Sequence, residues 1–254
     1  MIRRQELAKI AELKHLELRN AEKDYLLELI LYAVSDFKRF LAFKGGTALY
    51  KFYNLNRFSE DLDFDVVGKR ADLDAIIKKV IRTFELLGMR GTIFEKEEHG
   101  NEVNVRLSVR GPLYEGSKES MTRITINLSR RERPELIEGG MHVPSYPEIP
   151  SFELSVLHPK EIAAEKIRCI MTREKARDVY DLWFLLKRGA PIDVSLVNRK
   201  CRIYNIKFGR EAFIAKLHEK RGMWTRDLKG LVIGSLPEFD AVAKEIEDDY
   251  RKWA

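Results

Sequence analysis

Hydrophobic and polar residues follow two different spacings in the first half of the chain, and each spacing predicts one type of element. Apolar residues spaced as on one helix face predict helices over residues 5–18, 20–36, 47–53 and 72–87. Short apolar runs and strict alternation predict strands over residues 40–43, 62–67, 91–96, 102–110 and 121–129. Because alternation puts successive side chains on opposite faces, these strands should have one apolar and one polar face.

The second half of the chain has a helical pattern. Helices are predicted over residues 158–172, 177–186, 193–202, 208–221 and 236–252. Between the halves, residues 134–150 are rich in proline and glycine and have no periodicity, which is typical of a passage between domains. We therefore expect an α/β (α+β) domain with a mixed sheet at residues 1–147 and a helical domain at 148–254.

Candidate chemistry is concentrated around two glycines and three aspartates. Gly45 and Gly46 follow the first predicted strand, and Asp61, Asp63 and Asp65 alternate with apolar residues in the second. This period of two places the aspartates on one face of the strand. Carboxylates packed so closely repel each other unless a cation lies between them, and Mg²⁺ prefers oxygen ligands. The sequence thus predicts a metal site, with Asp65 alternatively a surface carboxylate.

The glycine turn complements that site. Glycines let the backbone approach a phosphate closely, and the start of a helix directs free N–H groups at an anion. Thr47 can cap the following helix and donate to a phosphate oxygen. Arg57 and Ser59, just before the aspartates, either bind phosphates or shape the turn.

The string Phe-Lys-Gly-Gly-Thr-Ala-Leu at residues 43–49, followed by Arg-Phe-Ser-Glu-Asp-Leu-Asp-Phe at 57–64, resembles the AbiEii/AbiGii toxin nucleotidyltransferases. This group lies within the polymerase-beta-type nucleotidyltransferase superfamily. The resemblance implies a polymerase-beta-like core with a C-terminal helical domain, and an active site in the cleft between them. It also implies an NTP substrate (GTP among the candidates), tRNA or another RNA as acceptor, and a cognate antitoxin.

The resemblance also assigns residues to roles. Asp61 and Asp63 would hold Mg²⁺, and Asp61, Asp63, Lys166 and Asp181 would be catalytic. The nucleotide would contact Lys44, Gly45, Gly46, Thr47, Arg57, Ser59 and Lys166. The last of these belongs to a second motif, His-Pro-Lys-Glu-Ile-Ala-Ala-Glu-Lys at residues 158–166 followed by Arg-Asp-Val-Tyr-Asp-Leu at 177–182.

A structural alternative exists for the second motif. Asp178 and Asp181 lie about one helical turn apart, as do Glu161, Glu165 and Arg168. A two-helix hairpin cross-linked by ion pairs, with residues 183–185 buried, would produce the same pattern.

Asn127 departs from the superfamily pattern, which commonly has a third carboxylate on a later strand as general base. An amide can orient a hydroxyl but cannot take a proton. Either the base lies elsewhere, with Asp178 or Asp181 as candidates, or transfer is slow, or the protein binds nucleotide without transferring it. A small-molecule nucleotidyltransferase of the antibiotic-modifying sort is a further alternative.

Charge and composition add little to this interpretation. The 254 residues carry 46 Lys and Arg against 40 Asp and Glu, a net charge of +6, which modestly favours an anionic partner. A basic section at residues 198–230 with interleaved aromatic residues predicts either an RNA-binding surface or amphipathic helices with solvated lysines. Two cysteines cannot build a disulfide framework, and neither a signal peptide nor a transmembrane run is evident. We expect a cytoplasmic protein with no membrane partner.

Overall fold

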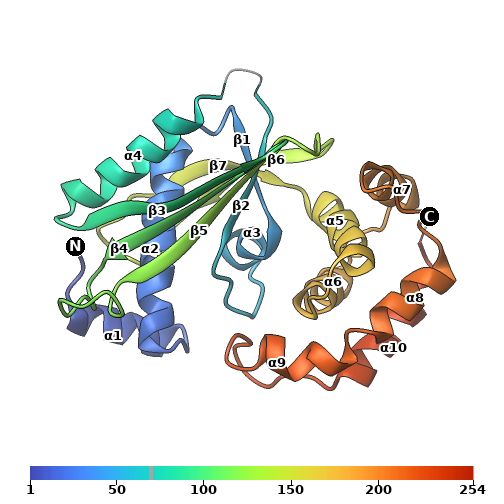
Figure 1. Ribbon diagram of the computed structural model, residues 1–254. Coiled ribbons are helices and arrows are strands. Elements are labelled where there is room, and N and C mark those ends of the chain that lie inside the picture. The colour runs from blue at the N-terminus through green and yellow to red at the C-terminus, as the bar shows by residue number, and fades with distance from the viewer. Residues whose placement is uncertain (69–70, 254) are drawn as a thin grey trace. The chain divides into compact units, whose positions relative to one another are not determined.

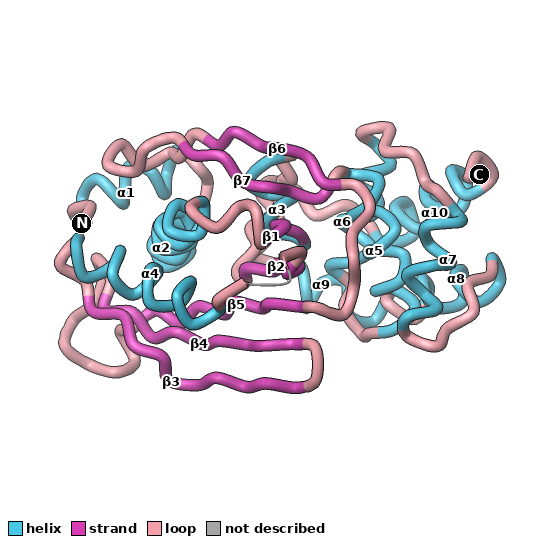
Figure 2. Tube along the Cα trace, turned by 90° about the horizontal axis from the view of Figure 1, so that it is seen from above, coloured by secondary structure: helices cyan, strands magenta, loops and turns pink. Residues whose placement is uncertain are grey.

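A seven-stranded mixed sheet organises the N-terminal half of the chain in the computed structural model, which describes residues 1–68 and 71–253 (Figure 1). Its strands are β1 (Leu41–Lys44), β2 (Leu62–Val66), β3 (Arg90–His99), β4 (Glu102–Arg110), β5 (Thr122–Ser129), β6 (Ile137–His142) and β7 (Phe152–Leu157). Figure 2 shows their order, β3-β4-β5-β2-β1-β7-β6, with β3 and β6 at the two edges. The central β2 pairs antiparallel with β1 and parallel with β5.

Chain contacts divide the protein into two compact units. Unit 1 contains residues 1–52, 58–133 and 137–156, and it holds nearly the whole sheet. Unit 2 contains residues 53–57 and 134–136, together with the chain from residue 157 onward. The domain boundary expected at residues 147 and 148 stays a prediction.

Four helices accompany the sheet in unit 1: α1 (Arg4–Leu13), α2 (Leu18–Ser35), α3 (Gly45–Phe52) and α4 (Leu73–Leu86). α2 is buried on nearly all sides, and it packs against α4 and β5. α4 begins after Asp72, whose side chain accepts a hydrogen bond from the Ala75 N–H and so caps the helix. Figure 1 shows α2 behind the strands β3, β4 and β5, and Figure 2 shows it along one side of these strands.

The alternation predicted for β4 and β5 is confirmed, and it gives the sheet two different faces. Val105 of β4 lies opposite Ile126 of β5, and both are fully buried. The intervening positions, including Asn104 and Asn127, form a second face that is partly exposed. Burial of the apolar face against helices supplies the main stabilisation of such a layer.

Unit 2 is helical, as the sequence predicts. Its helices are α5 (Pro159–Thr172), α6 (Arg177–Lys187), α7 (Val194–Ile203), α8 (Arg210–His218), the 3₁₀ turn η1 (Arg221–Met223), α9 (Trp224–Leu228) and α10 (Phe239–Tyr250). α5 packs against α6, α7 and α8. Within the described part of the chain, no helix combines the length and apolar character required to cross a bilayer.

One sequence prediction about the fold is wrong. The proline- and glycine-rich segment 134–150, which has no periodicity in the sequence, contains β6, and β7 follows directly. Gly139 and Gly140 suggested a loop, but both lie within β6. Glycine fits these positions because neighbouring side chains occupy the space that a Cβ atom would need. A Cβ atom on Gly140 would lie 2.7 Å from the Phe52 ring. The helix expected from Thr47 begins two residues earlier, at Gly45.

Candidate active site

The first glycine of α3, Gly45, lies next to the side chain of Asp63 of β2 in unit 1. Gly45 has a φ angle of +78°, a conformation that disfavours residues with a Cβ atom. The space that a Cβ atom would occupy lies only 2.6 Å from Oδ2 of Asp63. The carboxylate therefore packs against the glycine backbone at the N-terminus of α3. The sequence prediction that these two motifs share one site is consistent with this geometry.

Thr47 fixes the glycine turn to the start of β2. Its side chain is fully buried, and its hydroxyl donates a hydrogen bond to the main-chain carbonyl of Asp61. The prediction that Thr47 caps the helix is wrong, because the residue lies inside the first turn and its hydroxyl acts as a donor. The single hydroxyl hydrogen is thus used within the protein. Thr47 therefore holds Asp61 near Gly45 and Gly46.

The strand register surrounds Asp63 with polar side chains. Lys44 of β1 and Asn127 of β5 lie directly opposite it on either side. Asn127 donates a hydrogen bond from Nδ2 to Oδ1 of Asp63, at 2.8 Å. Asp65 is 0% exposed, and its Oδ1 lies 2.7 Å from the Lys44 ammonium. The alternative that Asp65 is a surface carboxylate is therefore wrong.

The two aspartate carboxylates in unit 1 suit a Mg²⁺ ion whose other ligands are oxygens of a substrate and of water. Among residues 1–68 and 71–253, no cluster of three or more His, Cys, Asp or Glu side chains is arranged to hold a metal ion. Magnesium commonly uses only one or two carboxylates and takes further oxygens from substrate phosphates and water. Asp63, directed at the glycine backbone, and the half-buried Asp61 would supply two such carboxylates, and their role as ligands stays a prediction.

A second group of charged residues lies in unit 2, on α5, α6 and the segment 53–57. Arg57 binds both carboxylate oxygens of Asp181, through Nε and Nη2, at 2.7 Å each. The Lys166 ammonium lies 2.6 Å from Asp181 and 3.0 Å from Asp178. Arg173 also forms a bidentate pair with Asp178. This is the ion-paired hairpin considered from the sequence, although Trp183 is half-buried rather than buried.

Burial and ion pairing determine the protonation of this cluster. Burial alone would raise the pKa of Asp178, but Lys166 and Arg173 outweigh it and lower the pKa well below its usual range. Likewise, burial opposes ionisation of Asp181, yet Arg57 and Lys166 lower its pKa. A carboxylate held in its charged form by two cations is a weak proton acceptor. The geometry therefore argues against Asp178 or Asp181 as the general base.

The other residues predicted to contact the nucleotide differ in their burial and in the groups that their side chains contact. Ser59 and Gly46 are buried in unit 1, and Lys44 is half-buried there beside Asp65. Arg57 and Lys166, expected to bind phosphate, direct their charged groups at carboxylates inside unit 2. Their role in binding nucleotide stays a prediction.

Sequence reasoning missed a buried ionic cluster that holds α3. Lys51, on the last turn of α3, lies 2.5 Å from Asp24 and 2.6 Å from Glu28, both on α2. His142 of β6 contacts Glu28 at 2.8 Å, and Lys14 also binds Asp24. No motif marks these residues, because they are far apart in sequence and each resembles an ordinary surface charge.

The basic section at residues 198–230 contains both buried and exposed side chains, and its role in binding RNA stays a prediction. Phe208 and Trp224 are buried, so their rings are not available to stack on bases. Lys200 is buried against Glu161 and Glu165, and Glu161 also accepts hydrogen bonds from main-chain N–H groups of segment 134–136. These buried residues serve packing and ion pairing within unit 2, whereas Arg202, Lys207 and Lys229 are exposed.

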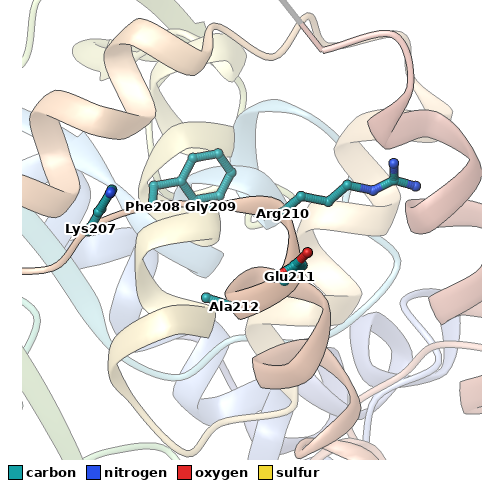
Figure 3. Close-up of a pocket in the computed structure, with 6 residues that line it drawn as sticks. All are labelled: Lys207, Phe208, Gly209, Arg210, Glu211 and Ala212. Carbon is teal, nitrogen blue, oxygen red and sulfur yellow. The ribbon is translucent and has the colours of Figure 1, made fainter.

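An open pocket of about 350 Å³ lies within this section, lined by residues 207–212 (Figure 3). Figure 3 shows the Lys207 and Arg210 side chains pointing away from each other. The Arg210 guanidinium lies over the ring of Tyr250, with 5.4 Å to the centroid. The lining comes from one continuous stretch of chain, so polar groups do not converge on a ligand as in a typical binding site.

Comparison with solved structures shows the same fold in other proteins. MenT4, a nucleotidyltransferase toxin of Mycobacterium tuberculosis, is 21% identical and has a TM-score of 0.68, covering 98% of this chain and 89% of its own. A proposed nucleotidyltransferase of Helicobacter pylori is 21% identical with a TM-score of 0.62, covering 93% and 98% of the two chains. No curated protein sequence matches the chain.

The chain shares its fold with these two proteins, both of which are described as nucleotidyltransferases. Residues 29–245 match the family described as nucleotidyl transferase AbiEii toxin, type IV toxin–antitoxin system. The chain therefore belongs to the AbiEii nucleotidyltransferase toxins, because this match spans most of its length.

Proposed function

We propose that this toxin transfers a nucleoside monophosphate from an NTP, with GTP as the first candidate, to a hydroxyl of tRNA or another RNA. The acceptor oxygen forms a bond to the α-phosphorus, the bond between the α-phosphorus and the bridging oxygen breaks, and pyrophosphate leaves. We further propose that the activity requires Mg²⁺ and is restrained by a cognate antitoxin. The observation that carries this proposal is the contact between Asp63 and the Gly45 backbone.

The residues of unit 1 have separate roles in this proposal. Asp61 and Asp63 hold Mg²⁺, which when bound neutralises charge on the triphosphate and polarises its phosphorus centre. Main-chain N–H groups at the N-terminus of α3 attract the phosphates. Asn127 orients Asp63 through its hydrogen bond. Because an amide cannot accept the proton of the acceptor hydroxyl, we propose that this proton passes to water.

A labelling assay tests the proposal. The protein is incubated with each labelled NTP, Mg²⁺ and total tRNA, beside Asp63→Asn and a control variant, Asp74→Asn. Asp74 is an exposed carboxylate on α4, and it pairs with Lys96 at the surface. Labelled RNA from the wild type and Asp74→Asn, with at least a hundredfold less from Asp63→Asn, is expected. Equal labelling by all three proteins would contradict the role of Asp63.

Asn127 supports a second candidate function, which is nucleotide binding without transfer. It occupies the register position beside Asp63 where a carboxylate base would be expected. The same assay separates the two functions. Saturable NTP binding without label on RNA or on any added hydroxyl compound would favour the binding protein, whereas label on a small compound would favour a small-molecule transferase.

A further inference from the structure

The polar face of the sheet in unit 1 continues outward from the candidate catalytic aspartate. Asn127 lies beside Asp63 on this face, and Asn104 of β4 lies beside Asn127. The same face carries the alternate side chains of the two strands, namely Arg106 and Ser108 of β4 with Arg123 and Thr125 of β5. The opposite face is buried, with α2 behind it (Figure 1). A substrate that reaches Asp63 can therefore extend along a partly exposed polar surface.

A β-bulge places an aromatic residue on this surface. Ile93 pairs with Leu107 and Glu95 pairs with Arg106, so Phe94 is the extra residue between them. Bulges re-direct a side chain and occur often beside active sites. Phe94 is 46% exposed, and its ring centroid lies 5.3 Å from the Arg123 guanidinium carbon. The contact with Arg123 shows that the ring faces the polar side.

Arg123 and Arg106 differ in how their charges are used. Arg106 pairs with Glu95, and its pKa is raised chiefly by that carboxylate and to a smaller degree by Glu97 and Asp61. Arg123 is exposed, and within the described ranges no carboxylate lies at ion-pair distance from it. Its cation is therefore available to a ligand, while its flat guanidinium covers part of the Phe94 ring.

The distance between Phe94 and Asp63 indicates what kind of ligand Phe94 and Arg123 would bind. β3 is three strands away from β2, and strands lie about 4.8 Å apart, so Phe94 is at least about 14 Å from Asp63. This exceeds the span of the nucleoside that reacts at Asp63. A half-exposed aromatic ring with an adjacent cation, set beyond the reacting group, fits an unpaired base and a phosphate of a longer single strand.

We propose that Phe94 and Arg123 form a subsite for the acceptor RNA, in which Phe94 stacks on a base and Arg123 binds a backbone phosphate. The base is not the reacting nucleotide but one further along the strand. This inference rests on the proposed RNA acceptor, and it assigns residues that discriminate a polynucleotide from a small hydroxyl compound.

Binding of single-stranded RNA tests the subsite without any catalytic step. Affinities for a trinucleotide and a dodecanucleotide are measured for the wild type, Phe94→Ala, Phe94→Trp and Arg123→Gln. Matched controls are Leu86→Ala and Arg82→Gln, which change an exposed apolar and an exposed basic residue on α4. The Michaelis constants for NTP and for total tRNA are measured in parallel.

Phe94→Ala should weaken dodecanucleotide binding by roughly 5- to 150-fold, the range that one base–aromatic contact supplies. It should leave trinucleotide binding and the Michaelis constant for NTP unchanged, and Phe94→Trp should restore binding. Arg123→Gln should weaken binding and reduce its salt dependence. Unchanged affinity in Phe94→Ala, with wild-type protein still labelling RNA, overturns the subsite alone. Failure of wild-type protein to bind or label RNA overturns the proposed acceptor and the subsite together.

Discussion

At the scale of single residues, Gly45 is the position where backbone conformation and candidate chemistry coincide. Its positive φ angle favours glycine, and Asp63 occupies the space where a side chain would begin. Gly88 has nearly the same conformation, with φ +74°, but no atom lies within 4 Å of the position of its Cβ. Comparing substitutions at Gly45 and Gly88 therefore separates the effect of backbone strain from the effect of displacing Asp63.

We predict that Gly88→Ala lowers the free energy of unfolding by about 1–2 kcal/mol, the cost of a left-handed conformation for alanine, and that Gly45→Ala lowers it by at least this amount. Only Gly45→Ala should abolish RNA labelling, because its new methyl group must displace Asp63. Urea unfolding and the labelling assay measure the two effects. Equal loss of activity in both variants would refute the contact as the cause.

Asn127 provides a second prediction at this scale. Asn127→Asp replaces the hydrogen bond to Asp63 with like-charge repulsion, so the melting temperature without metal should fall. Added Mg²⁺ should raise the melting temperature of this variant more than that of the wild type, because a third carboxylate strengthens the site. Asp63→Asn should lose the Mg²⁺ effect. Thermal unfolding with EDTA and with Mg²⁺ is the measurement; identical Mg²⁺ responses in all three proteins would contradict it.

Period-two patterning predicted the alternation of the strands around Asp63, but not which strands pair. Asn127 was expected near Asp63 from the resemblance to the superfamily, which has a third carboxylate at this position, and the two side chains form a hydrogen bond. The use of the Thr47 hydroxyl could not be predicted. Threonine can accept or donate, and its partner is fixed only when Asp61, fourteen residues later, is placed in space.

At the scale of elements, the orientation of α3 depends on the buried ionic cluster around Lys51. Burial opposes the charge of Lys51, yet Asp24 and Glu28 outweigh it and raise its pKa. The two acids have lowered pKa values, because Lys51 and its neighbours offset the cost of burial. The helix that starts at Gly45 is therefore fixed to α2 by charge as well as by packing.

Lys51→Met should lower the free energy of unfolding by about 3–5 kcal/mol, because it leaves two buried carboxylates with fewer cations. Lys79→Met is the control. Lys79 also pairs with an acid, Asp36, but both side chains are exposed, so the loss should stay below about 1 kcal/mol. Urea unfolding at neutral pH measures both, and similar losses would contradict a special role for the cluster.

The same cluster predicts a pH dependence. The acids have depressed pKa values in the folded protein, so their stabilising contribution is present above the unfolded values near about 4 and declines as the pH falls below them. The stability gap between the wild type and Lys51→Met should accordingly narrow below about pH 4. A gap that stays constant from pH 7 to pH 3 would show that the charges are not coupled in this way.

Helix and strand predictions were most accurate where the periodicity is long. β4, β5, α4 and α5 all lie within a few residues of their predicted bounds. β6 was missed because Gly139 and Gly140 interrupt the alternation of apolar and polar residues. Close packing explains why glycine occupies both positions. The helices η1 and α9 were missed because three to five residues are too few to show a helical period.

At the scale of the whole molecule, each unit has its own buried ionic cluster. Lys51 and its partners belong to unit 1, whereas Asp181 with Arg57 and Lys166 belongs to unit 2. Their energetic effects should therefore be observed in different parts of the chain.

Asp181→Asn should accelerate amide hydrogen exchange in α5 and α6, because it weakens the pairing of two buried cations. Exchange in α2 and β4 should change little. Lys51→Met should show the opposite distribution, and each variant is the control for the other. Equal acceleration throughout the chain in both variants would show that the two clusters stabilise a single cooperative unit.

The fold class followed from the sequence, but the composition of the two units did not. Hydrophobic periodicity predicts elements, and it carries no information about which unit a short connecting segment joins. Residues 53–57 illustrate this limit, because they pack with unit 2 although both flanking segments belong to unit 1. Arg57 explains the arrangement, since its guanidinium pairs with Asp181.

The position of β7 has a practical consequence for dissecting the gene. This strand is the parallel neighbour of β1, yet it is encoded after the proline-rich stretch that looks like a linker. A stop codon placed at that stretch would delete β7 and leave β1 with an unpaired edge beside the glycine helix. Fragments designed from the apparent linker should therefore aggregate, and loss of toxicity in such a truncation would say nothing about the helical half.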